Sequence, residues 1–302
     1  MTGGPDLAIA GLCWEWSVTA LEVVRLPWSD PPMQTAPITR GGFASTQRVD
    51  RWWVAPAATA VGLVVFFGYL TLRAFHPVYV WADPYISPTV APPVFTPAVG
   101  YPGSVPVAHA WFGAFPAWWP AFLPQSPSFF VPGLAIAFRF TCYYYRGAYY
   151  KAVFLTPPSC AVEGAPRKYS GERVLLVFQN LHRYTLYGAL FLLVFLWKEA
   201  LSAFFLDGQF GIGVGTVVMV INASLLTGYT FGCHSWRHLI GGRMDCFTCD
   251  GAISPRYRLW KGSSWLNTRH MAFAWFSLVW VAFTDVYIYL VSSGAIRDLN
   301  TW

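Results

Sequence analysis

The side chains of this chain that are best suited to chemistry are histidines and cysteines, and most of them lie in or beside long apolar stretches. One such stretch ends with Gly232-Cys-His-Ser-Trp-Arg-His238. On a helix, His234 and His238 share one face because they are four residues apart, and Cys233 points about 100° away from His234. A single helix would therefore present a thiol and two imidazoles, which are ligands of redox metals.

Three further candidates, Cys142, His182 and His270, lie in or at the start of other apolar stretches. Ligating side chains at membrane depth are costly to bury without a partner, so we treat them as functional candidates. A haem would take two axial His from facing helices, whereas a Rieske-type [2Fe–2S] cluster would take two Cys on one iron and two His on the other. In a third interpretation no metal is bound, and the Cys pack while the His accept hydrogen bonds or relay protons.

The composition indicates that the elements holding these residues are embedded in a bilayer. Of the 302 residues, 55% are hydrophobic and 11% are charged, whereas a soluble domain carries about 25% charged residues. The aromatic content of 19% suits the belts of Trp and Tyr at membrane interfaces. The formal charge is +6 without a basic run, which argues against a nucleic-acid partner.

Five stretches are long and apolar enough to cross a hydrocarbon core, which takes about 20 helical residues. We therefore predict an all-α integral membrane protein, a bundle of five transmembrane helices spanning residues 53–302, preceded by an interfacial or cytoplasmic segment at 1–52. The predicted spans are Trp53–Leu72, Val131–Leu155, Val174–Phe204, Gly211–Ile240 and Leu266–Ser292.

Lys and Arg give the orientation. Basic residues cluster before the first span and in the loops after the second and fourth, whereas Phe75–Phe130 contains none. Cytoplasmic loops carry the excess of Lys and Arg, so we predict an inside N-terminus and an outside C-terminus. The Phe75–Phe130 segment is rich in Pro, which breaks the hydrogen-bond ladder of a helix, and we predict that it forms an outer cap.

A second group of side chains, near the inner end of the spans, is suited to binding a quinone headgroup. Tyr and Trp populate interfacial belts in any case, but an Arg inside an apolar helix, such as Arg139 or Arg183, needs an acceptor. The predicted cofactor-binding residues are Arg139, Tyr145, Arg183, Tyr184, Ser235, Arg237 and His270. On the last span, Asp285 either pairs with another polar group or marks a proton path.

The remaining cysteines give weaker signals. Cys246-Phe-Thr-Cys249 is a single CxxC motif, which fits zinc or a reduced structural pair. The six scattered Cys, Cys160 among them, do not suggest a disulfide framework.

Several motifs together resemble the single-chain membrane anchor of the actinobacterial-type succinate dehydrogenase, respiratory complex II. The likeness runs from about Trp53 to the C-terminus and is strongest from Phe138 to Gly294. It rests on Phe138-Arg-Phe-Thr-Cys-Tyr-Tyr-Tyr-Arg-Gly-Ala-Tyr-Tyr150, Pro157-Pro-Ser-Cys-Ala-Val162, Gln179-Asn-Leu-His-Arg-Tyr184, Gly232-Cys-His-Ser-Trp-Arg-His-Leu-Ile-Gly-Gly242 and Leu266-Asn-Thr-Arg-His270.

The resemblance implies a subunit of the bacterial plasma membrane that docks an FAD-containing flavoprotein and an iron–sulfur subunit on the cytoplasmic face. It would pass electrons to a quinone, with menaquinone expected, through a Rieske-like [2Fe–2S] cluster in place of haem b. The implied ligands are Cys142, His182, Cys233 and His238. Cys160 is the alternative for a Cys place, and His234 or His270 for a His place.

The sequence departs from the expected family pattern at Trp236, where some relatives are expected to have a further Cys. The chain has no Gly-rich dinucleotide fingerprint, so the dicarboxylate chemistry belongs to a partner subunit. Two alternatives stay open: a haem b anchor of a quinone oxidoreductase, and a transporter or anchor without redox chemistry.

Overall fold

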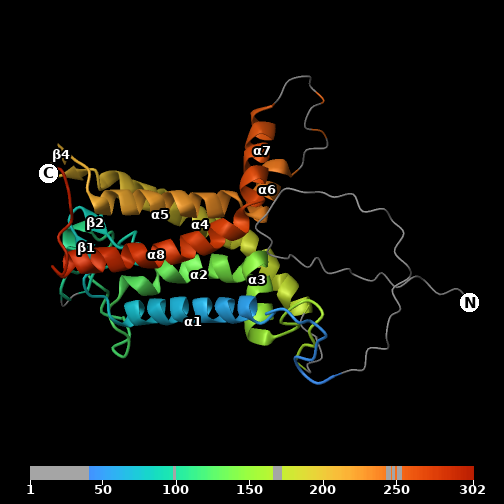
Figure 1. Cartoon of the computed structure of the whole chain (residues 1–302). Coiled ribbons are helices and arrows are strands. Elements are labelled where there is room, and N and C mark those ends of the chain that lie inside the picture. The colour runs from blue at the N-terminus through green and yellow to red at the C-terminus, as the bar shows by residue number, and fades with distance from the viewer. Residues whose placement is uncertain (1–40, 98–99, 166–171, 243–245, 247–248, 250–253) are drawn as a thin grey trace, which may run out of the picture.

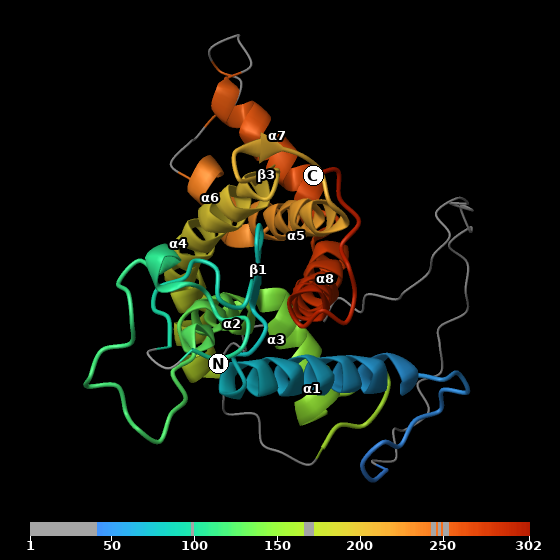
Figure 2. The same cartoon turned by 90° about the vertical axis from the view of Figure 1, so that its left-hand side faces the viewer.

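A bundle of long helices forms the body of the protein (Figure 1). The structure is a computed structural model that describes residues 41–97, 100–165, 172–242, 246, 249 and 254–302. The helices α4 (Glu172–Ser202), α5 (Val214–Phe231) and α8 (His270–Ser292) lie lengthwise in the bundle with the shorter α2 (Val131–Thr141) (Figure 1). Figure 2 views these helices from one end and shows α1 (Val54–Phe75) crossing them at an angle. The predicted N-terminal segment, residues 1–52, lies largely outside the described residues.

Four of the described helices are long and apolar enough to cross a membrane, namely Val54–Phe75, Asn180–Ser202, Val214–Phe231 and His270–Ser292. The predicted second span, Val131–Leu155, is not one helix. It consists of α2, the short α3 (Tyr143–Tyr149) and a π-helical turn, η3 (Tyr150–Phe154). The predominance of helices long enough to span a membrane is confirmed, while the number of five spans stays a prediction.

Two of the interruptions of the predicted spans occur at a cysteine. Cys142 between α2 and α3 has extended backbone angles, with φ −63° and ψ 131°, and Cys233 has φ −65° and ψ 142°. An extended residue ends the helical ladder, so the prediction of one helix from Gly211 to Ile240 was wrong beyond Phe231. The chain continues as α6 (His234–Gly241) and α7 (Pro255–Asn267), which lie across the end of the bundle (Figure 1).

The outer cap packs into the opposite end of the bundle. It contains β1 (Trp81–Ala82), β2 (Tyr85–Ile86) and the 3-10 turns η1 (Val107–His109) and η2 (Pro127–Phe129), with β1 and β2 antiparallel. Its apolar residues share a core with α4, α5 and α8, and these contacts include Val80, Ile86 and Val90 of the cap with Ala203 and Ile288. The segment is thus an integral part of the fold and contains no long helix, as predicted.

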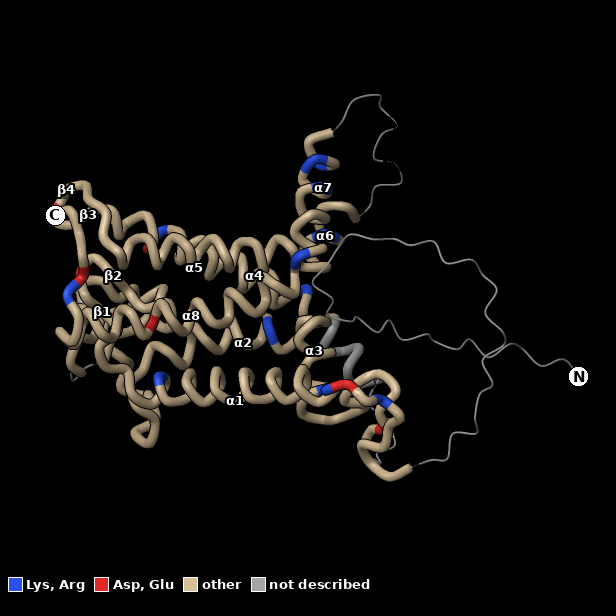
Figure 3. The backbone as a smooth tube through the Cα atoms, viewed as in Figure 1, with Lys and Arg blue, Asp and Glu red and all other residues tan. Residues whose placement is uncertain are grey.

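The charges are distributed unevenly along the bundle. Lys and Arg gather at the end where α6 and α7 lie, together with the residues before α1 (Figure 3). At the other end, a small antiparallel hairpin of β3 (Phe205–Leu206) and β4 (Gln209–Phe210) joins α4 to α5. We refer to the end with α6 and α7 as the inner end, following the predicted orientation.

Candidate metal centre

Two thiols and two imidazoles meet near the inner end of the bundle. His182 of α4 places its Nε2 atom 2.9 Å from the Sγ atom of Cys233. His270, the first residue of α8, places its Nε2 atom 3.8 Å from the Sγ atom of Cys142. Four separate elements therefore contribute one donor each.

The two thiol–imidazole pairs form one group. Cys142 and Cys233 belong to one buried core cluster. Phe138 stacks on His182 and Tyr229 stacks on His270, and the rings of Phe138 and Tyr229 contact each other with 5.6 Å between centroids. Cys142, Cys233 and His182 are buried. Across the described ranges, no three His, Cys, Asp or Glu side chains are arranged to hold a single metal ion.

This donor set fits a two-iron cluster better than a single ion. A [2Fe–2S] cluster needs only two protein ligands on each iron, and the Rieske type takes two Cys and two His. Two buried thiols and two nearby imidazoles are the ligands that this type requires.

Aromatic rings and a hydroxyl hold the two imidazoles in place. Phe138 stacks on His182 with 4.6 Å between ring centroids, and Tyr229 stacks on His270 with 4.9 Å. The Nδ1 atom of His182 lies 3.0 Å from the hydroxyl of Thr141. A hydrogen bond at one ring nitrogen fixes the orientation of the other, as is usual for histidines that bind metals.

His270 differs from His182 at the second nitrogen. Its Nδ1 atom is buried and has no hydrogen-bond partner among the described residues. Buried polar atoms normally have a hydrogen-bond partner, so a buried polar atom without one requires an explanation. A bound group near this ring would supply one.

The helix breaks place both thiols at helix N-termini. Cys142 is the N-cap residue of α3 and Cys233 that of α6. Neither sulfur forms a side-chain capping hydrogen bond at its helix. The positive end of a helix favours a negatively charged group such as a thiolate.

The fourth residue of the ligand set implied by the resemblance, His238, lies apart from the other three. Its Nε2 atom is 2.9 Å from that of His234, and both residues are exposed on α6. Because the chain turns at Cys233, α6 leaves the bundle and carries both imidazoles to the surface. Partial burial, with a smaller effect of His238 and the cations Arg237 and Arg183, lowers the pKa of His234 below its usual value. The structure thus brings His270, and not His238, to Cys142, His182 and Cys233.

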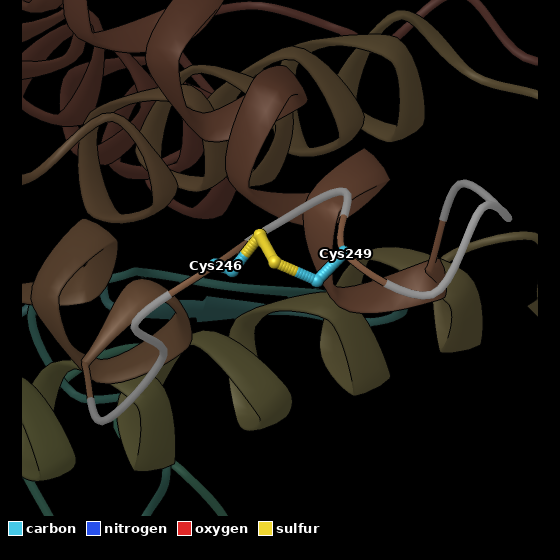
Figure 4. The surroundings of a disulfide bond; sticks show 2 residues. All are labelled: Cys246 and Cys249. Carbon is cyan, nitrogen blue, oxygen red and sulfur yellow. A yellow bond between two sulfur atoms is a disulfide. The ribbon is translucent and has the colours of Figure 1, made fainter.

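Three further cysteines among the described residues are disulfide-bonded. Cys246 and Cys249 form a disulfide in the connection between α6 and α7 (Figure 4), and Cys160 is also disulfide-bonded. Cys142 and Cys233 are the free cysteines among the described residues. The expectation of a zinc or reduced pair at the CxxC motif, and of Cys160 as an alternative ligand, is therefore not met.

The predicted quinone-binding residues differ in how far they are buried. Arg139 and Tyr145 are buried in the core, where the Nη1 atom of Arg139 donates to the Tyr145 hydroxyl at 2.6 Å. Arg183 and Tyr184 are exposed on α4, and Ser235 is half-buried on α6 beside Cys233.

Arg237 is the predicted quinone residue with the most distinctive surroundings. Its Nη1 atom donates to Asn267 Oδ1 at 3.2 Å, and its guanidinium lies 5.2 Å from the centroid of the Trp260 ring. Its Nε atom is buried without a partner in the described part of the chain. An oriented donor with one unused N–H suits a carbonyl acceptor.

The sequence alone did not single out several side chains around the centre. Phe138, Thr141 and Tyr229 contact the two imidazoles, and Asn267 orients Arg237. Phe138 and Tyr229 have the character of ordinary apolar or interfacial residues. Only their shared position, four residues before Cys142 and Cys233 respectively, could have suggested them.

A cavity of about 90 Å³ lies between α1, α2, α4 and α5. Its lining is mostly aliphatic, and it reaches Phe138, Arg139 and Tyr229 at its inner end. No His lines it, so this cavity does not offer the pair of facing imidazoles that a haem would need.

Comparisons with known proteins agree with the motifs described above. The family model for the actinobacterial succinate dehydrogenase subunit SdhC matches residues 54–294. A chain of the Mycobacterium smegmatis Sdh1 complex in the apo form is 39% identical and has a TM-score of 0.74, covering 88% of this chain and 97% of that chain. No curated protein matches. The chain belongs to the family of actinobacterial succinate dehydrogenase membrane subunits.

Proposed function

We propose that this membrane subunit carries electrons from an iron–sulfur partner to a quinone through a Rieske-type [2Fe–2S] cluster. Its ligands would be Cys142, His182, Cys233 and His270. The single observation that carries this proposal is the meeting of two buried thiols and two imidazoles from four elements. The cluster would supply one-electron chemistry within the membrane, at a reduction potential that imidazole ligands raise above that of an all-Cys cluster.

The residues of the chain would prepare this site in three ways. The N-termini of α3 and α6 favour negative charge at Cys142 and Cys233. Thr141 and the Phe138 ring orient His182, and the Tyr229 ring orients His270. Burial of Cys142 and Cys233 in the core would keep water from the sulfurs.

We further propose that quinone binds at the inner interface beside Arg237. The support is its buried Nε atom, which has no partner in the described ranges, and the orientation imposed by Asn267 and Trp260. The exposed His234 and His238 on the same helix are placed to supply protons to a reduced quinone. The quinone type follows from the family resemblance, which favours menaquinone.

The partners follow from family membership. A succinate dehydrogenase complex implies an FAD-containing flavoprotein and an iron–sulfur subunit, which would dock on the basic inner end with the N-terminus in the cytoplasm. A reporter fused after Trp302 should then be active only outside the plasma membrane, and activity confined to the cytoplasm would contradict this orientation.

The decisive experiment is chemical analysis of the purified complex. Iron and acid-labile sulfide should exceed the content of the soluble subunits by two atoms each, and Cys142→Ser should remove that excess. Succinate oxidation by a soluble acceptor should persist, because the flavin and soluble clusters are on the partners. Haem b absorption bands without additional sulfide would instead support the cytochrome alternative, and no additional iron would support an anchor without a redox centre.

A further inference from the structure

Arg139 is a buried cation whose hydrogen-bond partners are all neutral. Its Nη1 atom donates to the Tyr145 hydroxyl at 2.6 Å and to the Ala274 carbonyl at 3.1 Å, and its Nη2 atom donates to the Ser277 hydroxyl at 2.8 Å. The ion pairs found among the described residues involve Arg48, Arg73 and Lys198. A buried charge usually has a charged partner, so the absence of a carboxylate here requires an explanation.

This cation lies against the candidate metal centre. Arg139 precedes Cys142 by three residues, and its carbonyl accepts the Cys142 N–H at 3.1 Å where α2 ends. Its guanidinium lies over the Tyr229 ring at 4.6 Å from the centroid, and that ring stacks on His270. A single aromatic ring therefore separates the guanidinium from the His270 imidazole.

We propose that Arg139 is the counter-charge of the membrane-embedded centre and raises its reduction potential. The inference rests on the proposed function, because it presumes a redox centre at the four ligands. One-electron reduction adds a negative charge in a region of low dielectric, where a fixed neighbouring cation stabilises the reduced state strongly. The guanidinium keeps its proton throughout, since Arg is not deprotonated in proteins.

An alternative role for Arg139 is to connect helices. Its donors reach Tyr145 of α3 and both Ala274 and Ser277 of α8, so it joins three elements. The two roles predict different results for Lys at this position. Lys retains the charge but cannot reproduce the branched, planar set of donors that makes these bonds.

The test is a redox titration of the intact complex, followed by the electron paramagnetic resonance signal of the centre. In Arg139→Gln, the ratio of oxidised to reduced centre at a fixed potential should rise at least about tenfold, equal to a shift of about 59 mV to lower potential for one electron. Arg139→Lys should stay close to the wild type. Equal shifts in both variants would assign Arg139 a structural role and overturn the proposal.

A second variant keeps the test decisive if Arg139→Gln does not assemble. Ser277→Asp would place a carboxylate at the Nη2 atom and neutralise the cation without removing it, so the potential should fall in the same direction. Ser277→Ala, which removes one bond but no charge, is the matched control and should leave the potential unchanged. An unchanged potential in Ser277→Asp overturns the counter-charge, whereas a wild-type complex with no signal beyond that of the soluble subunits refutes the proposed function instead.

Discussion

Two polar clusters near opposite ends of the helix bundle bury their charged groups in different ways. Towards the cap, Asp285 of α8 is fully buried and pairs with Arg73 of α1, with 2.6 Å between Oδ2 and Nε. Its carboxylate also accepts hydrogen bonds from Tyr69, Ser87 and Thr89. Every charge in this cluster is balanced by groups of the chain itself, from α1, α8 and the cap.

The inner end leaves its polar groups incompletely balanced. Arg139 has neutral partners, and the Nδ1 atom of His270 and the Nε atom of Arg237 have no partner among the described residues. Native proteins satisfy nearly all buried polar atoms, so exceptions that lie together mark sites prepared for something else. The difference indicates that the Asp285 cluster connects elements, whereas the inner cluster is prepared for ligands.

The sharpest test of this contrast replaces each of the two candidate histidines, His270 and His238, with Ala in separate variants. His270→Ala should abolish the membrane cluster and quinone reduction, because one iron would lose a ligand. His238→Ala should retain the cluster, since that imidazole contacts His234 on the surface. The measurements are acid-labile sulfide and quinone reductase activity of the purified complex, with succinate oxidation by a soluble acceptor as the control. Loss of the cluster in His238→Ala but not in His270→Ala would restore the ligand set implied by the resemblance.

A substitution in the Asp285 cluster should lower the stability of the complex and leave the redox properties of the centre unchanged. Asp285→Ala leaves the buried Arg73 unpaired, and breaking a buried ion pair in this way costs about 3–5 kcal/mol. We expect a lower thermal midpoint of the complex with an unchanged spectrum of the centre. The double variant Arg73→Met with Asp285→Leu should recover part of the loss.

A different outcome for Asp285 would change the comparison. If Asp285→Ala kept its thermal midpoint but lost quinone reduction, the carboxylate would belong to a proton path. The Asp285 cluster would then be functional as well.

Arg237 should affect quinone binding alone. Arg237→Ala removes a charged hydrogen-bond donor, a contribution of about 1.5–3 kcal/mol, so the KM for quinone should rise at least about tenfold while the cluster remains. Arg258→Ala on α7 removes a charge from an exposed position of the same end and is the matched control. Equal effects of both variants would point to a general loss of positive charge at the docking surface.

The smallest effect is expected at the CxxC motif. Cys246 and Cys249 bond to each other, and both are exposed. Replacing both with Ser should leave the iron and sulfide content and the quinone KM unchanged. A loss of iron in this variant would reinstate these two cysteines as metal ligands.

The amino-acid sequence determined the membrane class, most of the long helices and the identity of three of the four proposed ligands. Long apolar stretches form helices in lipid because each backbone group must be satisfied within its own segment. The Pro-rich segment cannot do so, which is why we could predict that it does not form a spanning helix. Cys142, His182 and Cys233 were recognisable because thiols and imidazoles are unusual within such stretches.

Only the tertiary structure decided between His238 and His270, because the choice depends on the backbone at Cys233. A continuous helix would carry His238 towards the neighbouring helices, whereas the observed break at ψ 142° turns α6 across the bundle end. No proline lies within four residues of Cys142 or Cys233. A break in a helix that is set by packing leaves little signal in the local sequence. The neutrality of every hydrogen-bond partner of Arg139 was hidden for the same reason, since the acceptors of this buried cation are supplied by helices far apart in sequence.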